Sequence, residues 1–239
     1  EKVFQQWDSL CTFKDKEIMA EIEKSGLQRI SEVNDPEVRQ KLIPNHPFGC
    51  KRPLFSDNYY PIFNRENVDL ICEPIISLNK EGIETKKGLN RHNVVIYSTG
   101  FETTTYLNAI NVTGRDAKHL TQVWDDGAQA YLGITTAGFP NLFMLYGPNT
   151  NQGCILYMIE RQVEYTIRQI TRLRENDLSW LDLDPLVMKN FNEKLQKDIK
   201  EVDVWQAECG NDFYYRAGNS GRLVTQWPNS MTAYEEAIK

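Results

Sequence analysis

Two short apolar runs that each stop at a glycine constrain the fold of this chain most. Val94-Val95-Ile96-Tyr97 leads through Ser98-Thr99 to Gly100, and Leu142-Phe143-Met144-Leu145-Tyr146 leads to Gly147. Such runs are typical of buried parallel strands, whose carboxyl ends face a ligand crevice in an α/β sheet. A glycine at that end lets the backbone approach a ligand without an intervening side chain. The pattern therefore predicts an α/β fold with strands near 96 and 144 and a ligand site beside the glycines.

Helical signals surround these runs. Residues 13–43 read as helical, with a stop at Ser25-Gly26 and a new start at Asn34-Asp35-Pro36. Two amphipathic helices follow the second glycine. The first carries Ile155, Ile159, Val163, Ile167 and Ile170 at helical spacing; the second begins at Asp184-Pro185 and places Val187, Phe191, Leu195, Ile199 and Val202 on one face.

Short strands are expected between residues 68 and 98. The segments Val68-Asp69-Leu70-Ile71 and Ile75-Ile76-Ser77-Leu78 are rich in β-branched and large apolar residues, and Glu81-Gly82 marks a turn after them. The segment between Trp205 and Trp227 is rich in aromatic residues and glycine, which favours an irregular lobe.

Charge and cysteine content exclude several classes of protein. A net charge of −6 argues against nucleic acid or an anionic membrane surface as a partner. No apolar run is long enough to span a bilayer, and residues 1–8 show no basic-then-apolar signal pattern. The five cysteines are far apart and the histidines are isolated, which predicts reduced thiols, no metal site and a cytoplasmic location.

Generic nucleotide-binding motifs are missing from these 239 residues. No two glycines are separated by a single residue, so the G-x-G-x-x-G fingerprint is absent. Gly133 and Gly138 have the glycine spacing of a phosphate loop, but Phe139 stands where that loop needs lysine.

Several longer segments, taken together and in their order along the chain, resemble class B flavoprotein monooxygenases of the Baeyer–Villiger type. The segments are Gly49-Cys50-Lys51-Arg52-Pro53, Ser98-Thr99-Gly100-Phe101-Glu102, Trp124-Asp125-Asp126-Gly127, Gly138-Phe139-Pro140-Asn141-Leu142-Phe143, Gly147-Pro148-Asn149-Thr150-Asn151, Trp205 with Cys209, and Thr225-Gln226-Trp227-Pro228. The resemblance covers roughly residues 45–235.

This resemblance implies an oxidoreductase with FAD on one dinucleotide-binding fold and NADPH on another. The family inserts one oxygen atom from O2 into a ketone through a C4a-peroxyflavin, giving an ester or lactone. Arg52 matches the arginine beside the flavin that stabilises negative charge, a role suited to a guanidinium because it is always ionised. Heteroatom oxidation of an amine or sulfide is the alternative activity.

The resemblance also implies the cofactor-binding residues. Lys51 matches the lysine directed toward the cofactor, and Ser98, Thr99 and Gly100 match the turn where the sheet meets the linkers to the NADPH domain. Gly147, Pro148 and Asn149 match residues beside the flavin, and Cys154 precedes the helix whose positive N-terminal end is expected to face the flavin ring.

Two departures from the family pattern are visible. The connection Gln152-Gly153-Cys154 before the helix is shorter than in the family, which leaves the cofactor contacts of this loop open. Asp212-Phe213-Tyr214-Tyr215 replaces a tryptophan-tyrosine pair and so lacks the indole N–H donor.

The missing fingerprints predict that the chain is the C-terminal half of such an enzyme, because two dinucleotide domains and a substrate lobe need roughly 400 residues or more. The expected parts are the end of the NADPH domain with a helical insertion (1–98), the C-terminal part of the FAD domain (99–176) and a C-terminal lobe (177–239). A truncated, non-catalytic product is the alternative to an enzyme. The sequence indicates neither the oligomeric state nor which small ketone or heteroatom compound is the substrate.

Overall fold

The chain folds into two compact units in the computed structural model, which describes residues 7–206 and 215–239. The larger unit comprises Glu1–Ala20, His46–Arg52 and Glu102–Lys239, and the smaller one comprises Glu21–Asn45 and Pro53–Phe101. Cys209 and Asp212–Tyr214 lie outside the described residues. The domain boundaries expected at 98/99 and 176/177 refer to a longer enzyme and stay a prediction.

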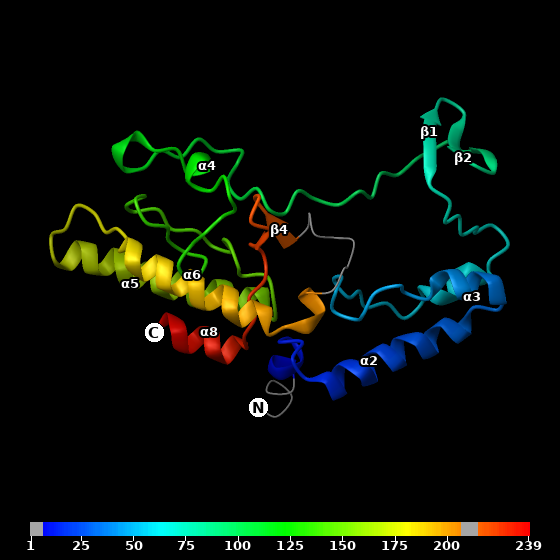
Figure 1. The fold of residues 1–239 in the computed structure, drawn as a ribbon, viewed down its shortest axis with the longest axis horizontal. Helices are drawn as coiled ribbons and strands as arrows, with labels where there is room; N and C mark the ends of the chain where they lie inside the picture. The colour runs from blue at the N-terminus through cyan, green and yellow to red at the C-terminus, as the bar shows by residue number, and fades with distance from the viewer. Residues whose placement is uncertain (1–6, 207–214) are drawn as a thin grey trace. The chain divides into compact units, whose positions relative to one another are not determined.

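The smaller unit combines helices with a small sheet (Figure 1). Helix α2 (Lys16–Arg29) enters it from the larger unit, and α3 (Pro36–Leu42) follows. Asp35 caps α3 as expected, since its carboxylate accepts from the N–H groups of Glu37 and Val38. The strands β1 (Ile75–Asn79), β2 (Gly82–Thr85) and β3 (Gly88–Arg91) form one antiparallel sheet in that order.

The regular elements of the larger unit are mainly helices, and long irregular segments connect them. Its longest helices are α5 (Ile155–Glu175) and α6 (Pro185–Lys200), accompanied by α4 (Leu120–Val123), α8 (Met231–Ile238) and the strand pair β4 (Arg216–Ala217) and β5 (Arg222–Leu223). Short 3₁₀ helices occur at Ile30–Glu32, Tyr60–Asn64, Arg115–Ala117 and Asp203–Trp205 across the two units. No helix within the described residues is both long and apolar enough to cross a membrane.

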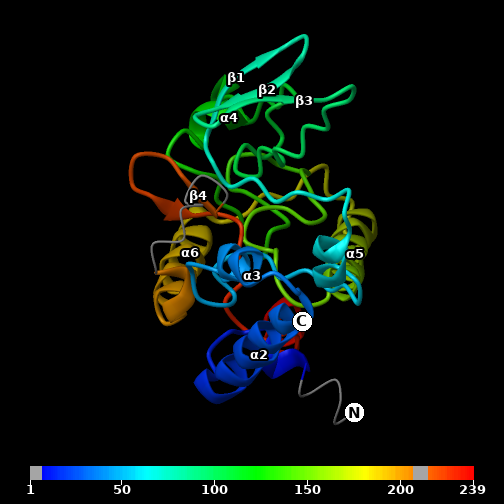
Figure 2. The same cartoon turned by 90° about the vertical axis from the view of Figure 1, so that its right-hand side faces the viewer.

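The main hydrophobic core lies among α5, α6 and α8. Met158 of α5, Ile199 of α6 and Tyr234 of α8 are buried in it, together with Ile134 from the irregular segment before α5. Figure 2 shows this irregular segment, in green, between α5 and α6. Burial of these apolar side chains is the main stabilising term, and it fixes the irregular segment without a sheet.

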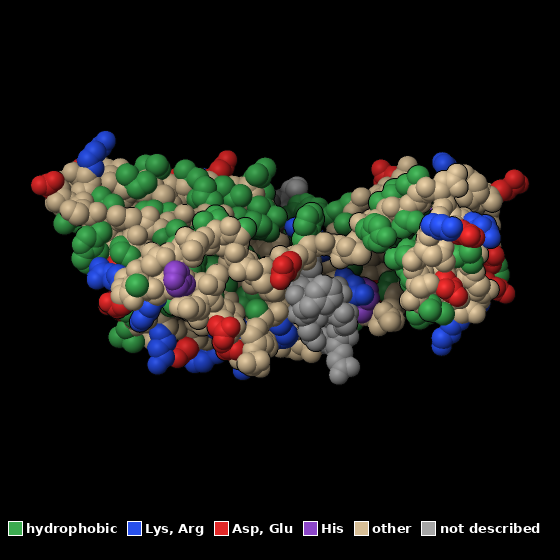
Figure 3. Space-filling view, turned by 90° about the horizontal axis from the view of Figure 1, so that it is seen from above, with side chains coloured by type: hydrophobic (Ala, Val, Ile, Leu, Met, Phe, Trp, Pro, Cys, Tyr) green, Lys and Arg blue, Asp and Glu red, His purple; other side chains and the backbone are tan. Residues whose placement is uncertain are grey.

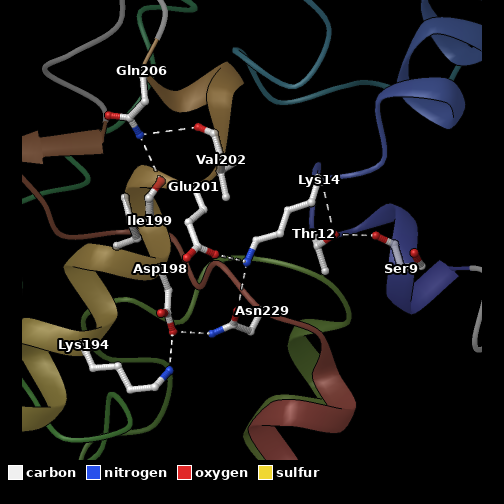
Figure 4. Close-up of polar contacts among 10 residues, drawn as sticks. All are labelled: Ser9, Thr12, Lys14, Lys194, Asp198, Ile199, Glu201, Val202, Gln206 and Asn229. Carbon is white, nitrogen blue, oxygen red and sulfur yellow. Dashed lines mark hydrogen bonds and ion pairs between the residues drawn. The ribbon is translucent and has the colours of Figure 1, made fainter.

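Polar contacts attach the N-terminal segment to this core (Figure 4). The Lys14 ammonium lies 3.4 Å from a carboxylate oxygen of Glu201 and donates to the side-chain oxygen of Asn229 at 3.2 Å. Asn229 donates in turn to Asp198, which Lys194 also contacts. Asp8 accepts from the backbone N–H of Thr232 at 3.2 Å and from its hydroxyl at 2.7 Å, at the start of α8. The N-terminal segment is therefore held against both α6 and α8.

The predicted strands at 94–97 and 142–146 are wrong, as is that at Val68–Ile71, whereas the strand at Ile75–Leu78 is confirmed as β1. The 94–97 segment is irregular, and Ile96 is 83% exposed. A strand needs a neighbour to pair its backbone groups, and no described segment pairs with 94–97. In the second run, Tyr146 has φ of 60°, which is incompatible with a strand. Apolar side chains are accordingly exposed on the smaller unit, as the face in Figure 3 shows in green.

The helix predictions need two corrections. Helix α2 continues through Ser25-Gly26 to Arg29, because nothing at Gly26 breaks the backbone ladder. Helix α5 begins at Ile155 as expected, but Met158 and Gln162 form its buried side, and Val163, Ile167 and Ile170 are exposed. The α6 prediction is confirmed for its cap Asp184 and for Leu195, Ile199 and Val202, while Val187 is exposed.

The prediction of reduced thiols holds for three cysteines and is wrong for one. Cys11, Cys72 and Cys154 are free, whereas the buried Cys50 is disulfide-bonded. Sequence spacing could not reveal this bond, because a disulfide depends on the distance between two Cα atoms in the fold.

Candidate functional site

The turn from Gly147 to Asn151 is the best-defined part of the predicted site. A Cβ atom on Gly147 would stand 2.3 Å from the carbonyl oxygen of Gly133, so these two backbone segments pack directly against each other. Gly133 is equally constrained, because a Cβ there would lie 2.1 Å from the Thr150 methyl carbon. The structure thus gives Gly147 a packing role. Its contact with a cofactor stays a prediction.

Asn149 joins this turn to the segment 223–227. Its backbone N–H donates to Val224, and its buried side-chain amide donates to the carbonyl oxygens of Leu223 and Gln226 at 2.9 and 3.1 Å. Its side-chain oxygen is buried without a partner among the described residues. Pro148 and Thr150 are fully buried beside it. Asn149 therefore uses its donors within the fold and keeps one acceptor unpaired.

Arg52 lies against the same turn. Its Nη2 donates to Oδ1 of Asn151 at 3.5 Å, a contact that joins residues 99 positions apart. The Arg52 side chain is exposed, and Lys51 beside it is half-buried. None of the ion pairs found within residues 7–206 and 215–239 involves Arg52. A cation that is exposed and has no carboxylate partner in this part of the chain can bind an anionic group.

The N-terminus of α5 follows the turn directly. Cys154 occupies the cap position, is exposed and makes no side-chain cap hydrogen bond. The first turn of α5 has no acidic residue, so its positive N-terminal dipole end has no charge partner there. The charged Arg52 and the partially positive N-terminus of α5 therefore both adjoin the 147–151 turn.

The short connection before α5 is well packed. Gly153 has φ of 62°, and a Cβ there would stand 2.9 Å from Cγ of Met231 in α8. Gln152 donates through its side chain to the carbonyl oxygen of Cys11. The short loop therefore makes close contacts with α8 and with the N-terminal segment.

Electrostatics argue against thiol chemistry at Cys11, whose carbonyl oxygen accepts from Gln152 of this loop. Burial raises the pKa of the Cys11 thiol, and the nearby Asp8 carboxylate and Cys154 raise this pKa further. The neutral thiol is therefore favoured at Cys11, and a thiol is a much weaker nucleophile than a thiolate.

The remaining predicted residues belong to the other unit. Ser98, Thr99 and Gly100 are exposed in an irregular segment of the smaller unit. The larger unit thus contains Arg52, Lys51, Gly147, Pro148, Asn149 and Cys154, while the binding role of each residue stays a prediction. Sequence reasoning assigned no role to Asn151 or Tyr146, although both stand in or beside the Gly147 segment; only the fold shows their contacts.

Known proteins resemble this chain over most of its length. A Baeyer-Villiger monooxygenase from Pseudomonas aeruginosa is 36% identical over 216 residues, which cover 89% of this chain and 41% of that protein. A Baeyer-Villiger monooxygenase from Streptomyces coelicolor is 33% identical over 213 residues, covering 87% of this chain and 40% of the relative. Over most of its length, this chain is similar to Baeyer–Villiger monooxygenases. The predicted resemblance to that family is confirmed, although no family model matches the chain.

The fold shows the same relationship. The crystal structure of OTEMO in complex with FAD and NADP superposes with a TM-score of 0.81 and 29% identity, over 94% of this chain and 42% of that protein. The α/β class expected from the sequence is confirmed. The chain spans about two fifths of the length of these relatives, as the 41% and 42% coverages show.

Proposed function

We propose that this chain is part of an FAD- and NADPH-dependent monooxygenase that inserts one oxygen atom from O2 into a small ketone. The observation that carries the proposal is the contact of the exposed Arg52 guanidinium with Asn151, in the turn that precedes the uncapped N-terminus of α5. The likeness to the Pseudomonas relative and to the FAD- and NADP-bound OTEMO structure supports the choice of cofactors.

The residues present fit the electron-rich edge of a flavin. Arg52 supplies a permanent positive charge, and the first N–H groups of α5 are donors without a side-chain acceptor. Bound FAD, reduced by NADPH, would supply the oxygen chemistry. The pyrophosphate of a dinucleotide has no fingerprint loop within these 239 residues, so that part of the binding site is assigned to other residues of the longer protein.

Arg52 would act by electrostatic stabilisation. A guanidinium stabilises negative charge on a reacting oxygen without giving up a proton, because this group is always charged in proteins. Ketone attack needs an anionic oxygen nucleophile, whereas oxygen transfer to a sulfur or nitrogen needs the protonated form. This difference favours ketone oxidation over the amine or sulfide alternative.

Cofactor retention is the first test. The purified chain is mixed with FAD, excess FAD is removed, and the visible flavin absorbance is measured. We expect no retained flavin from the chain alone, because the pyrophosphate loop is absent from it. Retained flavin would overturn the assignment of that loop to other residues.

Turnover is the second test, in a polypeptide that joins this chain to the two G-x-G-x-x-G segments of a relative. With ketone, NADPH and O2, we expect ester formation, flavin retention in Arg52→Ala, and a loss of ester by about 100-fold or more in that variant. Arg174→Ala is the matched control, since Arg174 is an exposed arginine in the last turn of α5. Wild-type ester yield from Arg52→Ala would refute the role of Arg52. Absence of any product, ester or oxidised heteroatom, from a flavin-loaded protein would favour the non-catalytic alternative.

A further inference from the structure

One amide oxygen collects two hydrogen bonds at the predicted site. Oδ1 of Asn151 accepts from Nη2 of Arg52 at 3.5 Å and from the Tyr146 hydroxyl at 2.8 Å. We propose that Asn151 and Tyr146 are positioning residues that orient the Arg52 guanidinium toward its anionic ligand. The proposal rests on the function proposed above for Arg52.

Asn151 is itself fixed on its other side. Its Nδ2 donates to Oε1 of the buried Gln226 at 2.5 Å, and its backbone N–H donates to Thr225 at 2.8 Å. An arginine side chain has only donors, so the atom of Asn151 that faces Arg52 must be the oxygen. The amide orientation is therefore determined, with oxygen toward Arg52 and nitrogen toward Gln226.

Tyr146 is held in an uncommon backbone conformation. Its φ of 60° lies in the left-handed region, which large side chains rarely adopt. The fully buried Gln162 of α5 accepts from the Tyr146 backbone N–H at 2.7 Å, and this contact helps to keep the conformation. The strained turn directs the Tyr146 hydroxyl to Asn151, so α5, the turn and the segment at Gln226 all converge on one amide group.

The neutrality of this acceptor decides its role. An amide oxygen limits the rotation of the long Arg52 side chain without cancelling its positive charge. A carboxylate at the same place would pair with the guanidinium and compete with an incoming anion. Replacing Asn151 with aspartate changes the charge while almost preserving the size, so this substitution separates the orienting role from mere packing.

The first experiment measures anion binding to the chain without cofactor. Inorganic phosphate is titrated while the Nε–H resonance of Arg52 is followed by NMR, in the wild type, Asn151→Asp and Tyr146→Phe. A unit negative charge about 4 Å away in the partly exposed site predicts about tenfold weaker phosphate binding or more in Asn151→Asp. In Tyr146→Phe we expect about threefold weaker binding, because Asn151 keeps its bond to Gln226.

Asn176→Asp is the matched control. It adds the same charge at Asn176, which follows the last residue of the 21-residue helix α5, at the end opposite Cys154. We expect unchanged phosphate affinity there. Tyr146→Phe removes only a hydroxyl, so it keeps the test informative if Asn151→Asp fails to fold. Wild-type phosphate affinity in both folded variants would overturn the positioning role.

The second experiment separates this inference from the proposed function. In the FAD-loaded polypeptide described above, product formed per NADPH oxidised is compared among Arg52→Ala, Asn151→Asp and Tyr146→Phe. We expect about a tenfold fall in Asn151→Asp and a smaller fall in Tyr146→Phe, each with FAD still bound. Loss of product in Arg52→Ala with wild-type yields in both other variants would refute the positioning role alone. Wild-type yield in Arg52→Ala would refute the function of Arg52, while the phosphate titration would still decide its orientation.

Discussion

Gly147→Ala is expected to destabilise the larger unit strongly, because of one backbone contact. The new Cβ would stand 2.3 Å from the Gly133 carbonyl oxygen, whereas ordinary contacts begin at 3.4 Å, an overlap of 3.4 − 2.3 = 1.1 Å. It would also lie 3.3 Å from Cβ of Met144. Overpacking of this kind costs about 1–3 kcal/mol and sometimes more. The obstacle is a backbone atom and not the end of a flexible side chain, so we expect a cost of about 3 kcal/mol, at the upper end of that range.

The sign of the effect makes this prediction decisive. Gly147 is not among the residues with positive φ, so without the overlap an alanine would stabilise the chain by about 0.4–1 kcal/mol through the unfolded state. Urea unfolding followed by circular dichroism and tryptophan fluorescence gives the free energy of unfolding of each variant. A Gly147→Ala midpoint equal to or above that of the wild type would refute the contact argument.

Gly138→Ala is the matched control in the same unit. Gly138 has φ of 86°, and no atom lies within 4 Å of the position that an alanine methyl group would take, so alanine there meets backbone strain alone. We expect a loss of about 1–2 kcal/mol. A larger loss in Gly138→Ala than in Gly147→Ala would mean that backbone strain outweighs the contact between the two glycine segments.

Three further predictions concern the stability of the helices and of the contacts between them. Asp8→Ala should lower the free energy of unfolding by about 2 kcal/mol, because the N–H and the hydroxyl of Thr232 lose their acceptor at the start of α8. Urea unfolding measures this change, and a loss below about 0.5 kcal/mol would contradict the prediction. Burial raises the pKa of Tyr234 above its ordinary value of 10. The contribution of the neutral Tyr234 to the free energy of unfolding should therefore be fully present below about pH 10 and should fall as the pH rises toward the folded-state pKa. Tyr234→Phe should remove the part of the fall in stability above about pH 10 that comes from Tyr234. At neutral pH the same substitution should lower the free energy of unfolding by about 1–3 kcal/mol, because the Leu132 carbonyl loses its 2.6 Å donor. If the fall in stability at high pH is the same in this variant as in the wild type, Tyr234 is not its source. Gly26→Ala should stabilise α2 by about 0.5–1 kcal/mol, since Gly26 lies inside the helix and has free space around it. A thermal unfolding midpoint below that of the wild type would contradict this prediction.

Local signals in the sequence were sufficient for several helices. Asp35-Pro36 and Asp184-Pro185 mark the starts of α3 and α6, because a cap depends only on residues within one turn. The spacing of Leu195, Ile199 and Val202 likewise identified the buried face of α6. The same reasoning failed for α5, whose apolar residues Val163, Ile167 and Ile170 are exposed. Periodicity identifies an apolar face but not what covers it.

The sequence by itself indicated the resemblance to Baeyer–Villiger monooxygenases, the α/β class and the principal helices, and it predicted the segments of the candidate site. The tertiary structure decided that 94–97 forms no strand, that Gly147 packs on Gly133, and that Asn151 links Arg52 to Tyr146 and Gln226. Motifs and caps can be recognised from neighbouring residues. A strand needs its pairing partner, and a contact between residues 99 positions apart needs the whole fold to bring them together.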